Sequence, residues 1–362
     1  MGIQLLAIAS ISLGLISRLY LVGTLPLWID ETFTYQLLAR PIYSLIDGTL
    51  DPTHPPGYYL YLKFWFFFNN SVIWLRLSSI LFFLISCCLL FGIGKRITSR
   101  NYAYFLVTSY ALSGYAVIYD WQIRAYSGLT AFILFSIYLL VMNPTKVIIF
   151  TFLILNILGI FFDYGFVWYL GSLILFLFYQ AIFSVNEKTK TKAALFLICA
   201  ASSACLYLLI WLLFYRNFLF AGLEGIKWVG FYTNLSFVIP FFLGAAHRLP
   251  LFITTQLGLF IIGCFYLLRT KQNILFYFLL ISSVVLIYTT NIISLLLIPI
   301  LHVRSMQVVG LSVIFTFALS FCWLYTRKFN SILLIALFVY VINFMLIINT
   351  LFLYPGKLLI KF

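Results

Sequence analysis

Charged residues are scarce in this chain, and acidic residues are the scarcest. Only 8% of the 362 residues are charged, with 8 Asp and Glu against 22 Lys and Arg. Hydrophobic residues make up 64% of the sequence and aromatic residues 20%. Soluble globular domains carry about 25% charged residues, so this composition excludes that class. It indicates a polytopic membrane protein.

Sequence motifs for nucleotide or metal chemistry are also absent. The chain has no Walker-type glycine loop, no His-Glu-x-x-His and no Gly-x-Ser-x-Gly. Its 6 cysteines all lie in apolar segments without metal-ligand spacing, which is typical of small core residues. The net charge of +14 is scattered between apolar segments, so we attribute it to membrane topology and anionic lipid rather than to nucleic acid.

The apolar segments predict an all-α architecture with about 11 transmembrane helices. Each segment holds roughly 17–25 mostly apolar residues, enough to cross a bilayer as a helix. Residues 1–24 lack a basic start and a cleavage site, so the first segment is expected to be a retained helix. No stretch between the segments could form a soluble domain, so one membrane domain is expected over 1–362. The expected spans are 3–23, 72–94, 101–119, 122–142, 146–162, 164–183, 193–215, 249–268, 273–290, 306–325 and 330–353.

Two shorter segments in the first long loop are expected to be juxtamembrane helices. Residues 57–68 are apolar but short, and residues 33–47 hold a second such piece. If 57–68 does not cross the membrane, all the basic clusters between the spans fall on one side, which the positive-inside rule makes cytoplasmic. Its Tyr and Trp rings and Lys63 suit the membrane interface.

This topology places almost all the carboxylates on the extracytoplasmic side. Only Glu187 is expected in the cytoplasm. Several arginines are expected at the same outer face, so helix ends there could form a polar cavity above a hydrophobic bundle. The carboxylates expected on the outer side are Asp30, Glu31, Asp47, Asp51, Asp120, Asp163 and Glu224.

Asp30 and Glu31 are the first candidates for chemistry, because carboxylates at a membrane edge are costly to keep there. They follow Trp28 directly after the first apolar segment. A partly desolvated carboxylate at this place can act as a general base. The alternative is a structural role, with Asp30 as the N-cap of a helix that begins near Thr32.

A histidine lies in the same loop. His54 precedes Pro55 and Pro56, which predict an extended entry into the helix that contains Tyr58. His54 is therefore a candidate for substrate binding, and a turn histidine without a chemical role is the alternative.

Three arginines near the outer surface are candidates for binding an anion. Arg76, Arg124 and Arg304 each lie near the expected outer end of a span, and each could instead extend to lipid headgroups. Three at one depth, beside carboxylates, point to an anionic ligand, because arginine holds phosphate with a fork of donors. Further candidates at outer helix junctions are Asp120, Tyr126, Asp163 and Tyr164.

Taken in order, these residues resemble the GT-C glycosyltransferases, most of all the glycosyltransferase family 39-like group. That group includes protein O-mannosyltransferases, the lipid A aminoarabinose transferase and transferases of lipopolysaccharide cores. The resemblance is closest over residues 18–126 and looser beyond them. Asp163 stands where many members have His, and Ser305 replaces a tyrosine. The segments that carry the resemblance are Arg18-Leu19-Tyr20, Leu27-Trp28-Ile29-Asp30-Glu31, His54-Pro55-Pro56-Gly57-Tyr58-Tyr59, Leu75-Arg76-Leu77-Ser78-Ser79, Gln122-Ile123-Arg124-Ala125-Tyr126, Phe162-Asp163-Tyr164 and His302-Val303-Arg304-Ser305.

The resemblance implies an enzyme that moves a monosaccharide from a polyprenyl-phosphate donor to a hydroxyl of a glycan, lipid or protein acceptor outside the cytoplasm. It makes Asp30 the catalytic carboxylate, with Glu31 and His54 shaping the acceptor side. Arg124 and Arg304 would bind the lipid phosphate. The implied location is the plasma (inner) membrane.

No cofactor is expected. Asp30, Glu31 and His54 could ligate a divalent cation, but their spacing is not diagnostic and arginines can meet the phosphate charge, so no essential metal is expected. The main alternative function is a transporter or flippase of a phosphate-bearing lipid-linked saccharide. It would need polar residues along a path through the bundle, whereas the charged residues gather at one face. A non-catalytic membrane scaffold is a third alternative.

Overall fold

The computed structural model describes residues 2–46, 51, 54–214, 250–270 and 307–353, and five single positions between 278 and 286. Among these residues every regular element is a helix and there is no strand. The helices are α1 (Ile3–Thr24), α2 (Ile29–Leu38), α3 (Ile42–Ile46), α4 (Pro56–Phe68), α5 (Val72–Ile97), α6 (Arg100–Ala111), α7 (Gly114–Tyr119), α8 (Tyr126–Val141), α9 (Lys146–Phe162), α10 (Gly165–Phe183), α11 (Glu187–Phe214), α14 (Pro250–Thr270), α16 (Gln307–Thr326) and α17 (Asn330–Leu353).

Seven of these helices are long and apolar enough to cross a membrane, so the prediction of an all-α polytopic membrane protein is confirmed. They are α1, α5, α10, α11, α14, α16 and α17. α8 and α9 occupy two further predicted spans as shorter apolar helices of 16 and 17 residues. The predicted span 273–290 lies almost entirely outside the described residues.

The predicted span 101–119 is interrupted. α6 ends at Ala111, and the hydroxyl of Ser113 caps α7 by accepting a hydrogen bond from the N–H of Ala116 at 3.2 Å. Arg18 of α1 stabilises the break, because its Nη1 donates to the carbonyl oxygen of Ala111 at 2.9 Å. The same guanidinium forms a buried ion pair of 2.9 Å with Asp120, which follows α7. The break could not be predicted from the apolar segment alone, because Arg18, which stabilises it, lies far away in the sequence.

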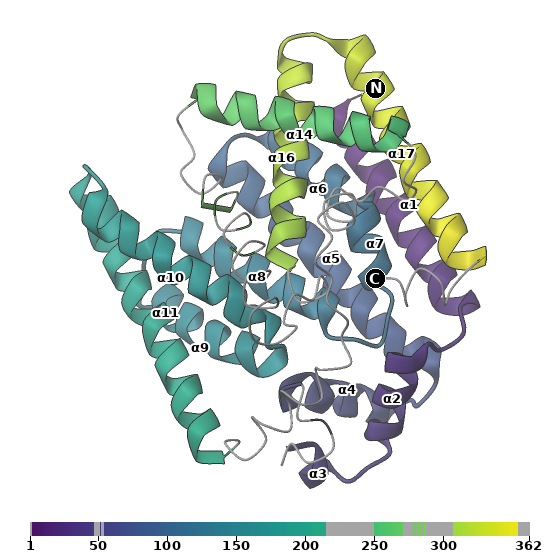
Figure 1. Cartoon of the computed structure of the whole chain (residues 1–362), viewed down its shortest axis with the longest axis vertical. Helices are drawn as coiled ribbons and strands as arrows, with labels where there is room; N and C mark the ends of the chain where they lie inside the picture. Colours follow the sequence, from purple (N-terminus) through teal and green to yellow (C-terminus); the bar gives the residue numbers. More distant parts are fainter. Residues whose placement is uncertain are drawn as a thin grey trace.

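The long helices pack into one bundle, and α16 lies at its centre (Figure 1). Almost every residue of α16 is buried, against α6, α8, α14 and α17. α1 packs on α5 and α6, α5 packs on α8, and α10 pairs with α11. α2, α3 and α4 lie together at the lower end of the bundle in Figure 1, and this group is called the α2–α4 layer below.

α4 has the two faces that an interfacial helix needs. Tyr58, Tyr59 and Leu62 are buried against the bundle, whereas Phe67 and Phe68 are 83% and 61% exposed. With 13 residues it is about 20 Å long, too short to span a bilayer of about 30 Å. The predicted short helix is therefore present, and its place at the membrane surface stays a prediction.

The contact between α14 and α16 offers a test of the bundle. A Cβ on Gly263 would collide with the backbone oxygen of Thr316, whereas a Cβ on Gly258 of the same helix would meet nothing within 4 Å. We expect Gly263→Val to lower stability by about 1–3 kcal/mol, the usual cost of overpacking. The matched control, Gly258→Val, should leave the thermal midpoint in detergent close to that of the wild type. Equal midpoints for the two variants would contradict this packing.

Candidate active site

A buried ion pair between Glu31 and Arg76 fixes the frame of the site. The carboxylate of Glu31 accepts from Arg76 Nη2 at 2.6 Å and from Arg76 Nε at 2.9 Å. The side chains are 0% and 1% exposed. Arg76 also donates to the carbonyl oxygens of Val22, Leu25 and Pro26, where α1 ends. A cation at a helix C-terminus satisfies carbonyls that have no partner inside the helix.

The same carboxylate holds the turn at residues 121–125. Glu31 Oε1 accepts a hydrogen bond of 2.8 Å from the backbone N–H of Ile123. Ser79 of α5 donates to the carbonyl oxygen of Gln122 at 2.5 Å. Arg124 follows directly, so the position of its backbone depends on the Glu31–Arg76 pair.

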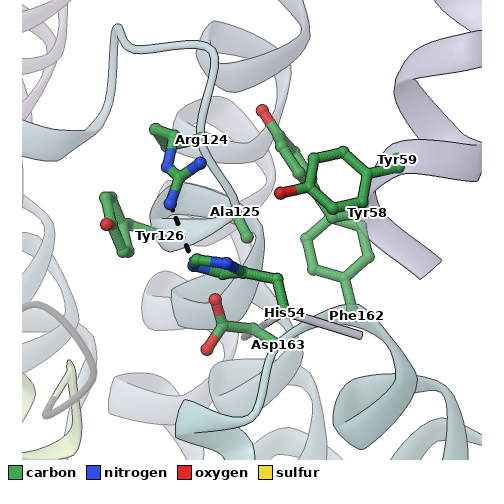
Figure 2. A pocket seen from close by; sticks show the side chains of 8 residues that line it. All are labelled: His54, Tyr58, Tyr59, Arg124, Ala125, Tyr126, Phe162 and Asp163. Carbon is green, nitrogen blue, oxygen red and sulfur yellow. Dashed lines mark hydrogen bonds between the residues drawn. The ribbon is translucent and has the colours of Figure 1, made fainter. Parts of the chain in front are cut away.

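A small pocket lies beside this turn, between the α2–α4 layer and the bundle (Figure 2). Its empty space is about 230 Å³ when the solvent at its mouth is counted, and the enclosed part has room for about one water molecule. Its walls combine one guanidinium, one imidazole, one carboxylate and several aromatic rings. The lining residues are His54, Tyr58, Tyr59, Arg124, Ala125, Tyr126, Phe162 and Asp163.

A chain of hydrogen bonds crosses the pocket wall. Tyr59 donates to the carboxylate of Asp51, which lies 2.9 Å from Nδ1 of His54. On its other side, Nε2 of His54 lies 2.9 Å from Nη2 of Arg124, the contact drawn in Figure 2. Arg124 Nη1 donates to the hydroxyl of Thr34 at 3.1 Å. The wall thus joins α2, α4, the His54 loop and the turn before α8.

Asp30 lies next to this chain, in the first turn of α2, and is half-buried. The hydroxyl of Thr34 connects it to the pocket, because this group donates to the carbonyl oxygen of Asp30 at 2.9 Å and accepts from Arg124. Burial lowers the pKa of Arg124, but the neighbouring side chains of Tyr126, Tyr59 and Asp30 raise it by more, so the net shift is upward. Trp28, not Asp30, is the N-cap of α2, so the predicted capping role of Asp30 is wrong. The helix begins earlier than expected because Glu31 bonds to the N–H of Trp28.

Asp163 approaches the imidazole from the opposite side of the pocket (Figure 2). It lies between α9 and α10, and its Oδ1 accepts from the N–H of Gly165 at 2.6 Å. Burial raises the pKa of Asp163 above its ordinary value, and the neighbouring His54 ring, the N–H of Gly165 and the charge of Arg124 offset part of that rise. A carboxylate kept at such a cost is typical of functional sites.

The structure brings only part of the predicted site together. His54, Tyr58, Arg124, Tyr126 and Asp163 line one pocket, with Asp30 close by. Glu31, Arg76 and Asp120 are in buried ion pairs outside the lining. Tyr164 packs near Tyr207, with ring centroids 6.4 Å apart. Arg304 lies outside the described residues.

Three residues of the site were not among the predicted site residues. Asp51 was predicted only as an outer carboxylate, although its spacing of three residues from His54 is a weak local signal. Tyr59 follows the predicted Tyr58, and Thr34 lies one helical turn after Asp30. Their roles depend on contacts between elements, which spacing alone does not show.

A bundle of membrane-length helices with a polar pocket at one end defines a multi-pass membrane protein. No protein-family model and no curated protein matches the chain. Among solved structures it is similar to the crystal structure of the Archaeoglobus fulgidus oligosaccharyltransferase, in complex with Zn and sulfate, at a TM-score of 0.57 and 10% identity. The match covers 95% of this chain and 53% of the other, so the chain spans about half the length of that protein. The oligosaccharyltransferase is a GT-C glycosyltransferase, and the likeness shows that this chain has a GT-C-like fold.

The Glu31–Arg76 pair can be tested by its effect on stability. Glu31→Gln leaves Arg76 buried without a counter-charge, and breaking such a pair costs about 3–5 kcal/mol. We expect a clear fall in the thermal midpoint in detergent. Asp30→Asn, one residue away and half-exposed, is the matched control and should unfold near the wild-type temperature. A stable Glu31→Gln protein would show that the pair does not hold the site.

Proposed function

We propose that this protein is a membrane glycosyltransferase that transfers a monosaccharide from a polyprenyl-phosphate-linked donor to a hydroxyl of a glycan, lipid or protein acceptor. The observation that supports it most is the contrast between Arg124 and the other buried arginines. Arg18 and Arg76 are neutralised by carboxylates. Among the described residues, Arg124 has no carboxylate within ion-pair distance, and its hydrogen-bond partners include the hydroxyl of Thr34 and the ring of His54.

A guanidinium in a pocket that forms no ion pair with a carboxylate is suited to bind phosphate, because arginine forms paired charge-assisted hydrogen bonds with phosphate oxygens. The GT-C-like fold supports a lipid-linked sugar as the source of that phosphate. In the proposed complex, Arg124 binds the donor phosphate and stabilises the charge that develops as polyprenyl phosphate leaves. Arg304 is proposed to assist it.

Asp30 is proposed as the general base. It removes the proton from the acceptor hydroxyl, whose oxygen attacks the anomeric carbon from the face opposite the phosphate, so the configuration inverts. Asp30 is half-buried, so part of the residue is accessible to an acceptor. The electrostatic interaction between Asp30 and Arg124 supports this role, because the base and the phosphate-binding group would then act on the same pair of substrates.

The other predicted residues fall into two groups. Tyr58, Tyr126 and Asp163 are proposed to contact the sugar. The hydroxyl of Tyr58 is buried and has no hydrogen-bond partner among the described residues, so a substrate hydroxyl would satisfy it. Glu31 is proposed to position Asp30 rather than to take part in catalysis, because its carboxylate is fully buried and occupied by Arg76. Arg76 and Asp120 are likewise proposed as positioning residues, and Tyr164 as an outer contact.

The location of the site is part of the proposal. The basic clusters between the apolar segments favour a cytoplasmic side opposite the α2–α4 layer. The pocket would then face the outside of the plasma (inner) membrane, at the level of the lipid headgroups.

Substitution of Asp30 tests the mechanism. We expect Asp30→Asn to lower the rate of sugar transfer by about 10²–10⁴-fold, the usual effect of losing a general base. The measurement is release of polyprenyl phosphate in proteoliposomes that contain polyprenyl-phosphate hexoses and an envelope glycan extract. Glu187→Gln removes an exposed carboxylate on α11 and should retain the wild-type rate. Near-normal turnover of Asp30→Asn would refute the role of Asp30, and lipid transport without transfer would favour the flippase alternative.

Metal removal tests the second part of the mechanism. We propose that no divalent cation is essential, because Arg124 and its neighbours can meet the charge of the leaving phosphate. We expect the transfer rate in EDTA to stay within about twofold of the untreated rate. Loss of activity in EDTA, with rescue by one divalent ion, would contradict this.

A further inference from the structure

The two ring nitrogens of His54 have different kinds of hydrogen-bond partner, a carboxylate that accepts and a guanidinium that donates. Nδ1 lies 2.9 Å from a carboxylate oxygen of Asp51, and Nε2 lies 2.9 Å from Nη2 of Arg124. A guanidinium has only donors, so Nε2 must accept the hydrogen from Arg124. The imidazole proton is then on Nδ1, where it donates to Asp51. With Arg124 in this position, His54 is neutral.

The surroundings of His54 would favour a second proton if Arg124 turned away. Asp51, held also by the hydroxyl of Tyr59, is one counter-charge, and Asp163 is another. Among the described residues that line the pocket, the other titratable groups are the hydroxyls of Tyr58 and Tyr126. Arg124 is the only cation among the residues that line this pocket, and its contact occupies the nitrogen that would be protonated.

A phosphate in the pocket competes for Arg124. The guanidinium gains charge-assisted hydrogen bonds with the phosphate oxygens and releases a bond to a neutral ring. Nε2 then no longer accepts the hydrogen bond from Arg124, and it lies beside an anion and two carboxylates. Protonation of Nε2 adds a second hydrogen-bond donor for the phosphate. The neutral ring, with its proton on Nδ1, has no donor on the side of Nε2.

We propose that binding of a phosphate monoester at Arg124 is coupled to the uptake of one proton by His54. The Arg124–Nε2 hydrogen bond breaks, Nε2 takes a proton from solvent, and both groups donate to the phosphate. When the phosphate leaves, Nε2 returns the proton to solvent and Arg124 returns to the ring. This inference rests on the proposed phosphate-binding role of Arg124 and assigns His54 to the donor phosphate instead of the acceptor.

The coupling has a definite sign. A ligand that brings one proton with it binds more tightly as the pH falls, by at most about tenfold per pH unit. The change in affinity is expected between about pH 6 and 8, the range in which histidine side chains ordinarily gain or lose a proton. Release of polyprenyl phosphate would accordingly be faster on the alkaline side of that range.

Calorimetry of the full chain in detergent tests the proposal. Farnesyl phosphate is titrated at pH 7.5 in two buffers that differ in heat of ionisation, which gives the number of protons taken up per ligand bound. Because the phosphate itself titrates near this pH, His54→Gln provides the baseline. We expect wild type to take up between half a proton and one proton more than His54→Gln, and Asp51→Asn to lie between them. Glu187→Gln should match wild type.

Inorganic sulfate gives a test that needs no variant. Sulfate does not titrate between pH 6 and 8, so any pH dependence of its affinity comes from the protein. We expect its affinity for the wild-type protein to rise severalfold from pH 8 to pH 6. A parallel titration with inorganic phosphate separates a free anion from a lipid headgroup: equal affinity with farnesyl phosphate would place the whole recognition on the phosphate group and support the coupling with either source.

The outcomes separate this inference from the proposed function. If farnesyl phosphate binds and Arg124→Gln abolishes binding, but wild type and His54→Gln take up the same number of protons, the coupling is refuted and the phosphate site stands. A sulfate affinity that does not change with pH refutes the coupling in the same way. If farnesyl phosphate does not bind, or binds equally well to Arg124→Gln, both the phosphate site and the coupling are refuted.

Discussion

The ion pair between Glu31 and Arg76 is the contact on which the rest of the site depends. It joins the end of α1, the first turn of α2, the start of α5 and the turn at 121–125 through one buried group of charges. Asp30 precedes Glu31 by one residue, and Arg124 follows Ile123 by one residue. The distance between Asp30, the proposed base, and Arg124, the proposed phosphate-binding group, therefore depends on an ion pair that does not line the pocket.

The cations Arg18, Arg76 and Lys63 share a structural role, because each satisfies carbonyl groups at a helix C-terminus. Arg76 bonds to the last carbonyls of α1, and Arg18 bonds to the last carbonyl of α6. Lys63 of α4 donates to the carbonyl oxygen of Leu38 at the end of α2 and to that of Arg40. In the bilayer core there is no water to donate a hydrogen bond to an unsatisfied carbonyl. Helices that end inside a bundle therefore need side-chain donors such as these. Arg124 differs because its known contacts are with side chains of the pocket.

The sequence was sufficient for the membrane class and for the short helix over 57–68. These follow from local properties: segment length, apolar composition and position relative to the helix ends. Which carboxylate pairs with which arginine could not be predicted, because Glu31 and Arg76 are 45 residues apart and Arg18 and Asp120 are 102 apart. In the sequence, Arg76 looked as available for a ligand as Arg124. The break after Ala111 was missed for the same reason, since the group that stabilises it belongs to another helix.

α4 combines two roles that are usually assigned to different parts of a membrane enzyme. Its buried face supplies Tyr58 and Tyr59 to the pocket, and its opposite face carries the exposed phenylalanines near its end. If that face rests in lipid, as its composition predicts, then the bilayer is a structural neighbour of the pocket, one helix diameter away. Membrane thickness and lateral pressure would act on the orientation of α4 and, through Tyr59 and Asp51, on the ring of His54. The lipid around this protein would then be a regulator of its chemistry as well as its solvent.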